Sequence, residues 1–180
     1  MTVIHQRLFE QPINLLFDGT FFSRSDGLIV YRANAKNLYW QFVKSEKMVN
    51  IKAGLRYLTQ LEYSFASFII DGRKGVIQLL KAHYPGIPIQ LCHFHQAQII
   101  RRYTTQNPKT DCGKELKAIM KCLTETSEVV FQNLVETWHE LWEEFLLERN
   151  ENGQFKHRRL RSAYRSLKNN RPYLFKLSKT

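Results

Sequence analysis

The chain contains 180 residues, of which 43% are hydrophobic and 13% aromatic. This length and composition exclude a disordered chain and allow one domain with a sizeable core, or one domain interrupted by a smaller unit. No run of about 18 apolar residues is present, so we expect no membrane-spanning segment.

The net charge of +11 is distributed unevenly along the chain. Residues 126–151 carry seven acidic side chains and one basic side chain, whereas residues 152–180 carry nine basic side chains and no acidic one. A cationic surface of this size predicts an anionic polymer as partner, most economically nucleic acid. A solvated basic face without a ligand is the alternative explanation.

The first ten residues contain no apolar signal segment, and the three cysteines are unevenly spaced. Both features are typical of a protein that is not exported and keeps its thiols reduced. We therefore expect a cytoplasmic location.

The N-terminal half alternates between strand-like and helix-like patterns. Three runs rich in β-branched and aromatic residues predict an antiparallel meander at residues 13–22, 28–32 and 38–43. Apolar residues at helical spacing predict a helix from a Ser45 cap to about Glu62. The remaining predicted elements are a buried strand at 65–70, a helix after Gly72, a fifth strand at 87–92 and a helix at 93–104.

This order, β-β-β-α-β-α-β, predicts an α/β fold with a mixed sheet of three antiparallel strands followed by two parallel strands. It is the order of the ribonuclease-H-like fold, in which the first strand lies beside the fourth. Residues 108–180 show helical patterns only.

Three Asp-Gly dipeptides occur in the chain, and each by itself is a common turn signal. Asp26-Gly27 lies between two strand-like runs and predicts a hairpin turn. Asp71 precedes a helical pattern, so we expect it at a strand end, and the predicted topology brings Asp18 beside it. Two carboxylates on a rigid sheet suit a divalent-metal site for phosphodiester chemistry, which usually needs a third acid. Neither Glu115 nor Glu125 has a context that identifies it as that acid.

The helical half contains one acidic and one basic helix pattern. Asp111 is expected to cap a helix through Leu123, and Ser127 a second helix whose apolar stripe packs in the core. That stripe comprises Phe131, Leu134, Val135, Trp138, Leu141, Trp142 and Phe145. A basic helix follows the break at residues 150–153, and its arginines offer the best phosphate contacts. The expected DNA-binding residues are Arg73, Lys74, Arg101, Arg102, Lys156, Arg158, Arg159, Arg161, Arg165 and Lys168.

Residues 92–95, CHFH, bring metal-ligand side chains into close spacing. A structural zinc site commonly has four ligands from two such closely spaced pairs. The sequence contains no second pair, so zinc is not favoured. Catalysis by a Cys92 nucleophile lacks an identifiable partner. We expect a strand-to-helix junction that orients the edge of the active site.

Several motifs resemble those of bacterial insertion-sequence transposases of the mutator type. Residues 16–22, LFDGTFF, are similar to the family's first-aspartate motif, and residues 70–75, IDGRKG, to its second. Residues 88–96, PIQLCHFHQ, are similar to its C/D-x-x-H motif, with Cys92 and His95 in the named places.

The similarity continues to the end of the family's helical insertion, which residues 158–167, RRLRSAYRSL, and residues 172–175, PYLF, resemble. The resemblance implies a ribonuclease-H-like catalytic core at residues 1–107 and a helical insertion at residues 108–180. The family is a DDE family that cuts DNA at transposon ends and joins the 3′-hydroxyl to target DNA.

By this resemblance Asp18 and Asp71 would be catalytic and would hold Mg²⁺ or Mn²⁺. The partners would be the DNA of transposon ends and target, in the nucleoid, and the full-length protein would form a homo-oligomer. We expect no membrane partner.

The chain departs from the family at the third acid. The family carries it in a Leu-Glu-Gly sequence beyond an Asn-rich stretch, and here no Glu follows Glu151. We expect weak metal binding and poor catalysis from this chain alone. Two alternatives remain: a non-catalytic DNA-binding remnant, and a ribonuclease-H-like nuclease with its third acid between Glu115 and Glu128.

Overall fold

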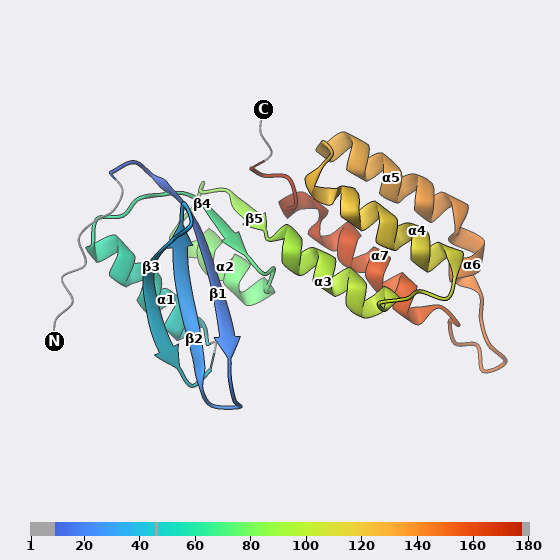
Figure 1. Cartoon of the computed structure of the whole chain (residues 1–180), viewed down its shortest axis with the longest axis horizontal. Helices are drawn as coiled ribbons and strands as arrows, with labels where there is room; N and C mark the ends of the chain where they lie inside the picture. The colour runs from blue at the N-terminus through green and yellow to red at the C-terminus, as the bar shows by residue number, and fades with distance from the viewer. Residues whose placement is uncertain (1–9, 46, 178–180) are drawn as a thin grey trace. The chain divides into compact units, whose positions relative to one another are not determined.

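A computed structural model describes residues 10–45 and 47–177, which form two compact units (Figure 1). The first unit extends to Gln90 and the second begins at Leu91. The sequence-based division was placed at residue 107. In the structure the helix that precedes this point, α3 (His93–Thr104), has its helix contacts with α4 (Asp111–Lys121) and α7 (Arg158–Asn170).

The sheet has five strands in the order β3-β2-β1-β4-β5. β1 is antiparallel to β2, β2 is antiparallel to β3, and β1 is parallel to β4. This arrangement confirms the α/β class, the mixed sheet and the expected antiparallel meander. The strands are β1 (Ile13–Phe21), β2 (Gly27–Ala33), β3 (Lys36–Val43), β4 (Phe65–Ile70) and β5 (Ile89–Leu91).

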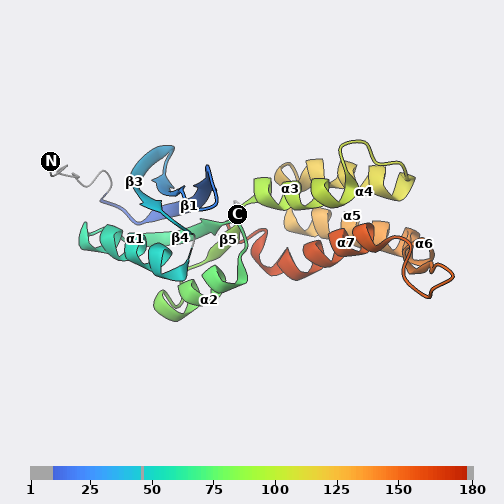
Figure 2. The same ribbon diagram turned by 90° about the horizontal axis from the view of Figure 1, so that it is seen from below.

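The two helices of the first unit, α1 (Met48–Gln60) and α2 (Lys74–His83), lie on one side of the sheet (Figure 2). α1 approaches so closely that a Cβ on Gly54 would lie 2.2 Å from the Tyr31 hydroxyl oxygen. The rings of Tyr39 and Tyr57 lie 4.5 Å apart in the same interface. The hydrophobic core of this unit therefore lies between the sheet and α1 and α2.

The start of α1 differs from the expectation. Ser45 does not cap the helix, because the N-cap residue is Lys47, whose side chain makes no capping hydrogen bond. The Asn50 amide instead donates to the Ser45 carbonyl oxygen at 2.7 Å. The expected Asp26-Gly27 hairpin is confirmed, since the Phe22 amide donates to the Asp26 carbonyl at 2.9 Å.

The second unit is helical. Its core includes Trp138, which is 2% exposed and whose Nε1–H donates to the Cys112 carbonyl at 2.9 Å. The cap at α4 is Thr110 rather than Asp111, and the expected Ser127 cap of α5 is confirmed. Besides α3, α4 and α7, the helices are α5 (Glu128–Leu141), α6 (Glu143–Leu147) and two short 3₁₀ turns, Cys122–Thr124 and Arg171–Tyr173.

The apolar stripe of α5 is only partly buried. Phe131, Val135 and Trp138 are buried, but Leu134 is 36% and Leu141 is 68% exposed. The expected stripe thus packs in the core in part, because α5 ends at Leu141 and the line through Leu134 and Leu141 runs along the edge of its contact with α4. Within the described ranges, no helix is both long and apolar enough to cross a membrane.

Candidate metal site and basic surface

Asp18 and Asp71 occupy matching positions on adjacent parallel strands. The register of β1 and β4 pairs Leu15 with Phe68 and Leu16 with Ile69. The observed pairing ends there; extended by two residues on each strand, the same register would align Asp18 with Asp71, which directly follows β4. Because neighbouring strands are about 4.8 Å apart and residues two apart share a face, both carboxylates follow the Leu16–Ile69 face. The strand register is therefore compatible with the proximity of the two aspartates that the sequence predicts.

The local backbone holds each carboxylate differently. Asp18 lies inside β1, and its Oδ1 accepts from the Gly19 amide at 2.9 Å. Asp71 follows the last residue of β4, and its Oδ1 accepts from the Arg73 amide at 3.2 Å. Gly72, which lies between Asp71 and Arg73 in the chain, has a φ of 93°, a left-handed conformation that favours glycine. This turn explains why the Asp71-Gly72 dipeptide ends a strand without starting a hairpin.

Two half-buried carboxylates at the edge of a rigid sheet fit a hard divalent cation. Among the residues that the structure describes, no group of three or more His, Cys, Asp or Glu side chains is placed to hold a metal ion. Mg²⁺ is commonly bound through one or two carboxylates together with substrate phosphates and water. The pair therefore suits a cation that a phosphate ligand completes.

Cys92 and His95 lie near the start of the second unit. Cys92 is the N-cap residue of α3, although its side chain makes no capping bond. His95 is half-buried and its ring packs edge-on against Phe94, with centroids 5.6 Å apart. The neighbouring His93 has no predicted role in the motif. It contacts the Leu174 carbonyl through Nε2, and its ring packs against the Phe175 ring. His93 thus connects the start of α3 to the segment after α7.

No family model matches this chain, and no curated protein matches it either. The function therefore has to be argued from the residues and their geometry.

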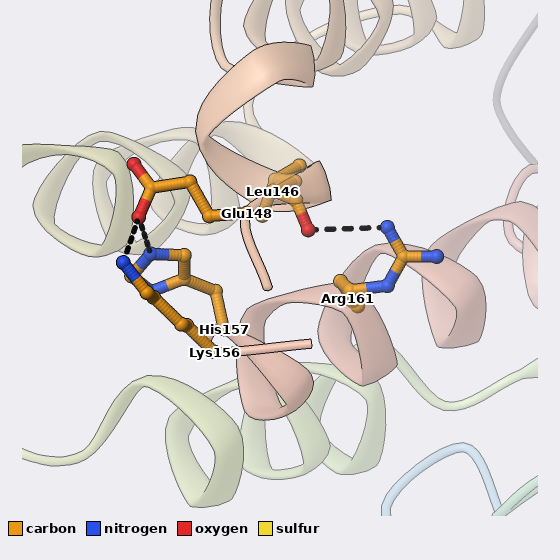
Figure 3. A network of polar contacts seen from close by, with 5 residues as sticks. All are labelled: Leu146, Glu148, Lys156, His157 and Arg161. Carbon is orange, nitrogen blue, oxygen red and sulfur yellow. Dashed lines mark hydrogen bonds and ion pairs between the residues drawn. The ribbon is translucent and has the colours of Figure 1, made fainter. Parts of the chain in front are cut away.

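Two arginines of α7 donate hydrogen bonds to backbone carbonyls of other helices. The Arg159 guanidinium donates to the carbonyl of Tyr103 at 3.2 Å and also to that of Arg102. The Arg161 Nη1 donates to the Leu146 carbonyl at 3.2 Å (Figure 3). These carbonyls belong to the last turns of α3 and α6, which lack intrahelical partners and carry the negative end of the helix dipole. Arg159 and Arg161 therefore act as C-terminal caps.

Glu148, between α6 and α7, has two basic neighbours, Lys156 and His157 (Figure 3). Its Oε2 lies 3.2 Å from Lys156 Nζ and 3.5 Å from His157 Nε2. The hydrogen bond from Lys156 holds the pKa of Glu148 below its ordinary value, with a smaller contribution from His157. The Arg161 guanidinium also lies 3.6 Å from the Phe155 ring centroid. The Lys156 ammonium thus forms an ion pair with Glu148 of the same chain.

The other predicted DNA-binding residues face solvent to different degrees. Arg73 is half-buried at the N-cap of α2, whereas the rest are exposed and lie on α2, α3 and α7. These exposed residues are Lys74, Arg101, Arg102, Arg158, Arg165 and Lys168. They are the exposed cationic side chains of each unit that remain after the capping residues are assigned.

The suggested third acids lie among residues with other partners. Glu115 Oε2 accepts from Trp142 Nε1 at 2.7 Å, and Glu128 Oε1 accepts from the Gln132 amide at 2.7 Å. Both belong to the second unit, on α4 and α5. No observation favours either one as a metal ligand.

Proposed function

We propose that this chain carries the two-aspartate part of a metal-dependent site that cuts and joins DNA, as in the transposases of the mutator type that it resembles. The observation that supports the proposal is the parallel register of β1 and β4, whose last pair, Leu16 and Ile69, lies two residues before Asp18 and Asp71. The ribonuclease-H-like identity of the sheet and the role of the second unit as a helical insertion belong to the same proposal.

Asp18 and Asp71 would hold Mg²⁺ or Mn²⁺, which activates a water or a 3′-hydroxyl and stabilises the charge that develops on the leaving oxygen. The sheet orients both carboxylates before the substrate binds, so less ordering is needed at the site. Exposed basic side chains such as Arg158, Arg165 and Lys168 would bind phosphates and orient the duplex. Asp18 and Asp71 are the catalytic residues of the proposal.

A matched control exists for the test, because Asp26 is a third aspartate in an Asp-Gly dipeptide of the same unit. It lies in the β1–β2 hairpin, where Ser23 Oγ donates to its Oδ2 at 2.6 Å. The experiment measures Mn²⁺ affinity by calorimetry and Mn²⁺-dependent nicking of supercoiled plasmid for Asp18→Asn, Asp71→Asn and Asp26→Asn.

We expect Asp18→Asn and Asp71→Asn each to weaken Mn²⁺ binding by at least about tenfold and to abolish nicking. Asp26→Asn should match the wild-type chain in both measurements. Nicking that persists in Asp18→Asn and Asp71→Asn would contradict the proposal.

A second candidate is DNA binding without catalysis. The absence of a third carboxylate beside the pair, among the described residues, favours it. Its signature is plasmid binding that falls steeply with salt, together with no nicking by the wild-type chain in Mn²⁺.

A further inference from the structure

Two large aromatic side chains lie exposed on β3. Trp40 is 50% exposed and Phe42 is 82% exposed, although neighbouring positions of the same strand are half-buried. Exposed side chains of this size cost free energy in water, and a group of them commonly marks a binding surface. The pair therefore needs an explanation that core packing does not supply.

Strand register connects these aromatic residues to the aspartates. Trp40 pairs with Val30 of β2, and Val30 pairs with Asp18 of β1. Directly paired residues of neighbouring strands point to the same face of a sheet. Trp40, Val30 and Asp18 consequently form one row across the sheet, and the β1–β4 register extends that row to Asp71.

This face is the one that α1 and α2 do not cover. The alternate residues Tyr31, Tyr39 and Gln41 point toward α1, where Gln41 Nε2 donates to the Asn50 carbonyl at 2.7 Å. The intervening residues, Trp40 among them, must point to the opposite side. Figure 2 shows α1 and α2 on one side of the sheet, and strand pairing with alternation assigns Trp40, Phe42 and Asp18 to the other side within the first unit.

The spacing of the pair suits nucleobases. Residues two apart on a strand are about 6.7 Å apart, which is about twice the 3.4 Å separation of stacked bases. At this backbone spacing, each ring can stack one base. Trp40 is two strands from Asp18, or about 10 Å, so one nucleic-acid strand can contact both.

Charge near the pair favours nucleic acid over an apolar protein segment. Arg32 alternates with Val30 on β2, so it lies on the same face, and its side chain is exposed. Residues 1–90 carry eleven basic and six acidic side chains. Aromatic rings combined with cations are the usual means by which proteins bind single strands without sequence preference.

We propose that Trp40 and Phe42 form a platform that stacks bases of single-stranded DNA beside the aspartate pair. The choice of DNA as ligand rests on the proposed function. The platform would hold unpaired bases next to the phosphate on which the metal ion held by Asp18 and Asp71 would act. Trp40 and Phe42 are positioning residues in this scheme.

The test uses the whole chain without divalent metal. A fluorescent single-stranded oligonucleotide and an abasic oligonucleotide of the same length are titrated, and anisotropy gives each affinity. We expect the wild-type chain to bind the base-bearing strand about tenfold more tightly than the abasic strand. Trp40→Leu and Phe42→Leu should each remove most of that preference and leave abasic binding unchanged. Leu141→Ala, which removes an exposed apolar side chain from the second unit, should bind as the wild type does.

Equal affinity of the wild-type chain for the two oligonucleotides would overturn the proposal. So would a wild-type dimer in sedimentation that Phe42→Leu dissociates, because a second copy would then cover the face. If Trp40→Leu does not fold by circular dichroism, the more exposed Phe42 supplies the same measurement. Asp18→Asn should keep the preference for bases, so the platform and the metal site fail independently.

Discussion

The close approach of α1 to the sheet predicts that Gly54→Ala destabilises the protein. In an open helix this change stabilises by about 1 kcal/mol, because glycine is a poor helix former. Here a Cβ would lie 2.2 Å from the Tyr31 hydroxyl oxygen and 2.3 Å from its Cζ, more than 1 Å inside the ordinary contact distance of 3.4 Å. Tyr31 is fully buried, and its hydroxyl donates to the Ile51 carbonyl at 3.2 Å.

The Tyr31 ring must shift, which adds strain and weakens that buried hydrogen bond. Strain of this kind costs about 1–3 kcal/mol and an unsatisfied buried polar group a similar amount, so after the gain of about 1 kcal/mol in helix propensity we expect a net loss of about 1–5 kcal/mol. Urea denaturation followed by circular dichroism measures it. The matched control is Gly75→Ala in α2, where the nearest atom to a new Cβ is the flexible Met48 sulfur at 3.4 Å.

Gly75→Ala should leave stability unchanged or raise it by up to about 1 kcal/mol. Adding Tyr31→Val should make the effect of Gly54→Ala smaller, because the shorter side chain vacates the contested space. If Gly54→Ala is as stable as the wild-type chain in urea, the packing argument is refuted.

Three further predictions concern the second unit. Arg159→Ala should lower the free energy of unfolding by about 1–2 kcal/mol, because two carbonyls lose their donor, whereas Arg158→Ala should change it by less than about 0.5 kcal/mol; equal effects in urea denaturation would contradict the capping role. The pKa of Glu148 is lowered in the folded state, so its ion pair stabilises above the ordinary pKa near 4.5, and this stabilisation is lost as pH falls through the lowered value. The urea midpoint of the wild-type chain should therefore fall more steeply with acidification than that of Glu148→Gln, and parallel curves would refute this. Burial, with a smaller effect of nearby negative charge, raises the pKa of the Cys112 thiol to about 12, so a thiol reagent should label half-buried Cys122 in the native chain and Cys112 only after unfolding, as mass spectrometry would show.

Local patterns predicted many of the elements accurately. The fourth strand has the expected limits, Phe65–Ile70, and α3 has the expected limits, His93–Thr104. Both depend on signals within a few residues, such as a β-branched run or a repeat at helical spacing. Ser127 as a cap belongs to the same class, because its partner is the amide of Val130, three residues away.

Predictions that needed distant partners were weaker. Nothing in the sequence near Arg159 indicates that Tyr103 accepts its hydrogen bond, 56 residues away. The exposure of Leu141 also could not be predicted, since its periodicity is that of a buried residue and only the position of α4 decides which residues are covered.

The amino-acid sequence by itself determined the class of the fold, the uneven charge and the two aspartates that follow apolar runs, because each depends on composition or on near neighbours. Tertiary structure decided that β1 pairs with β4 in a register that ends two residues before Asp18 and Asp71, and that Trp40 lies in one row with Val30 and Asp18. The physical reason is strand register. A slip of one residue between β1 and β4 would turn Leu15 and Phe17 out of the core, so their burial beside Phe68 and Ile70 selects the pairing that aligns the carboxylates.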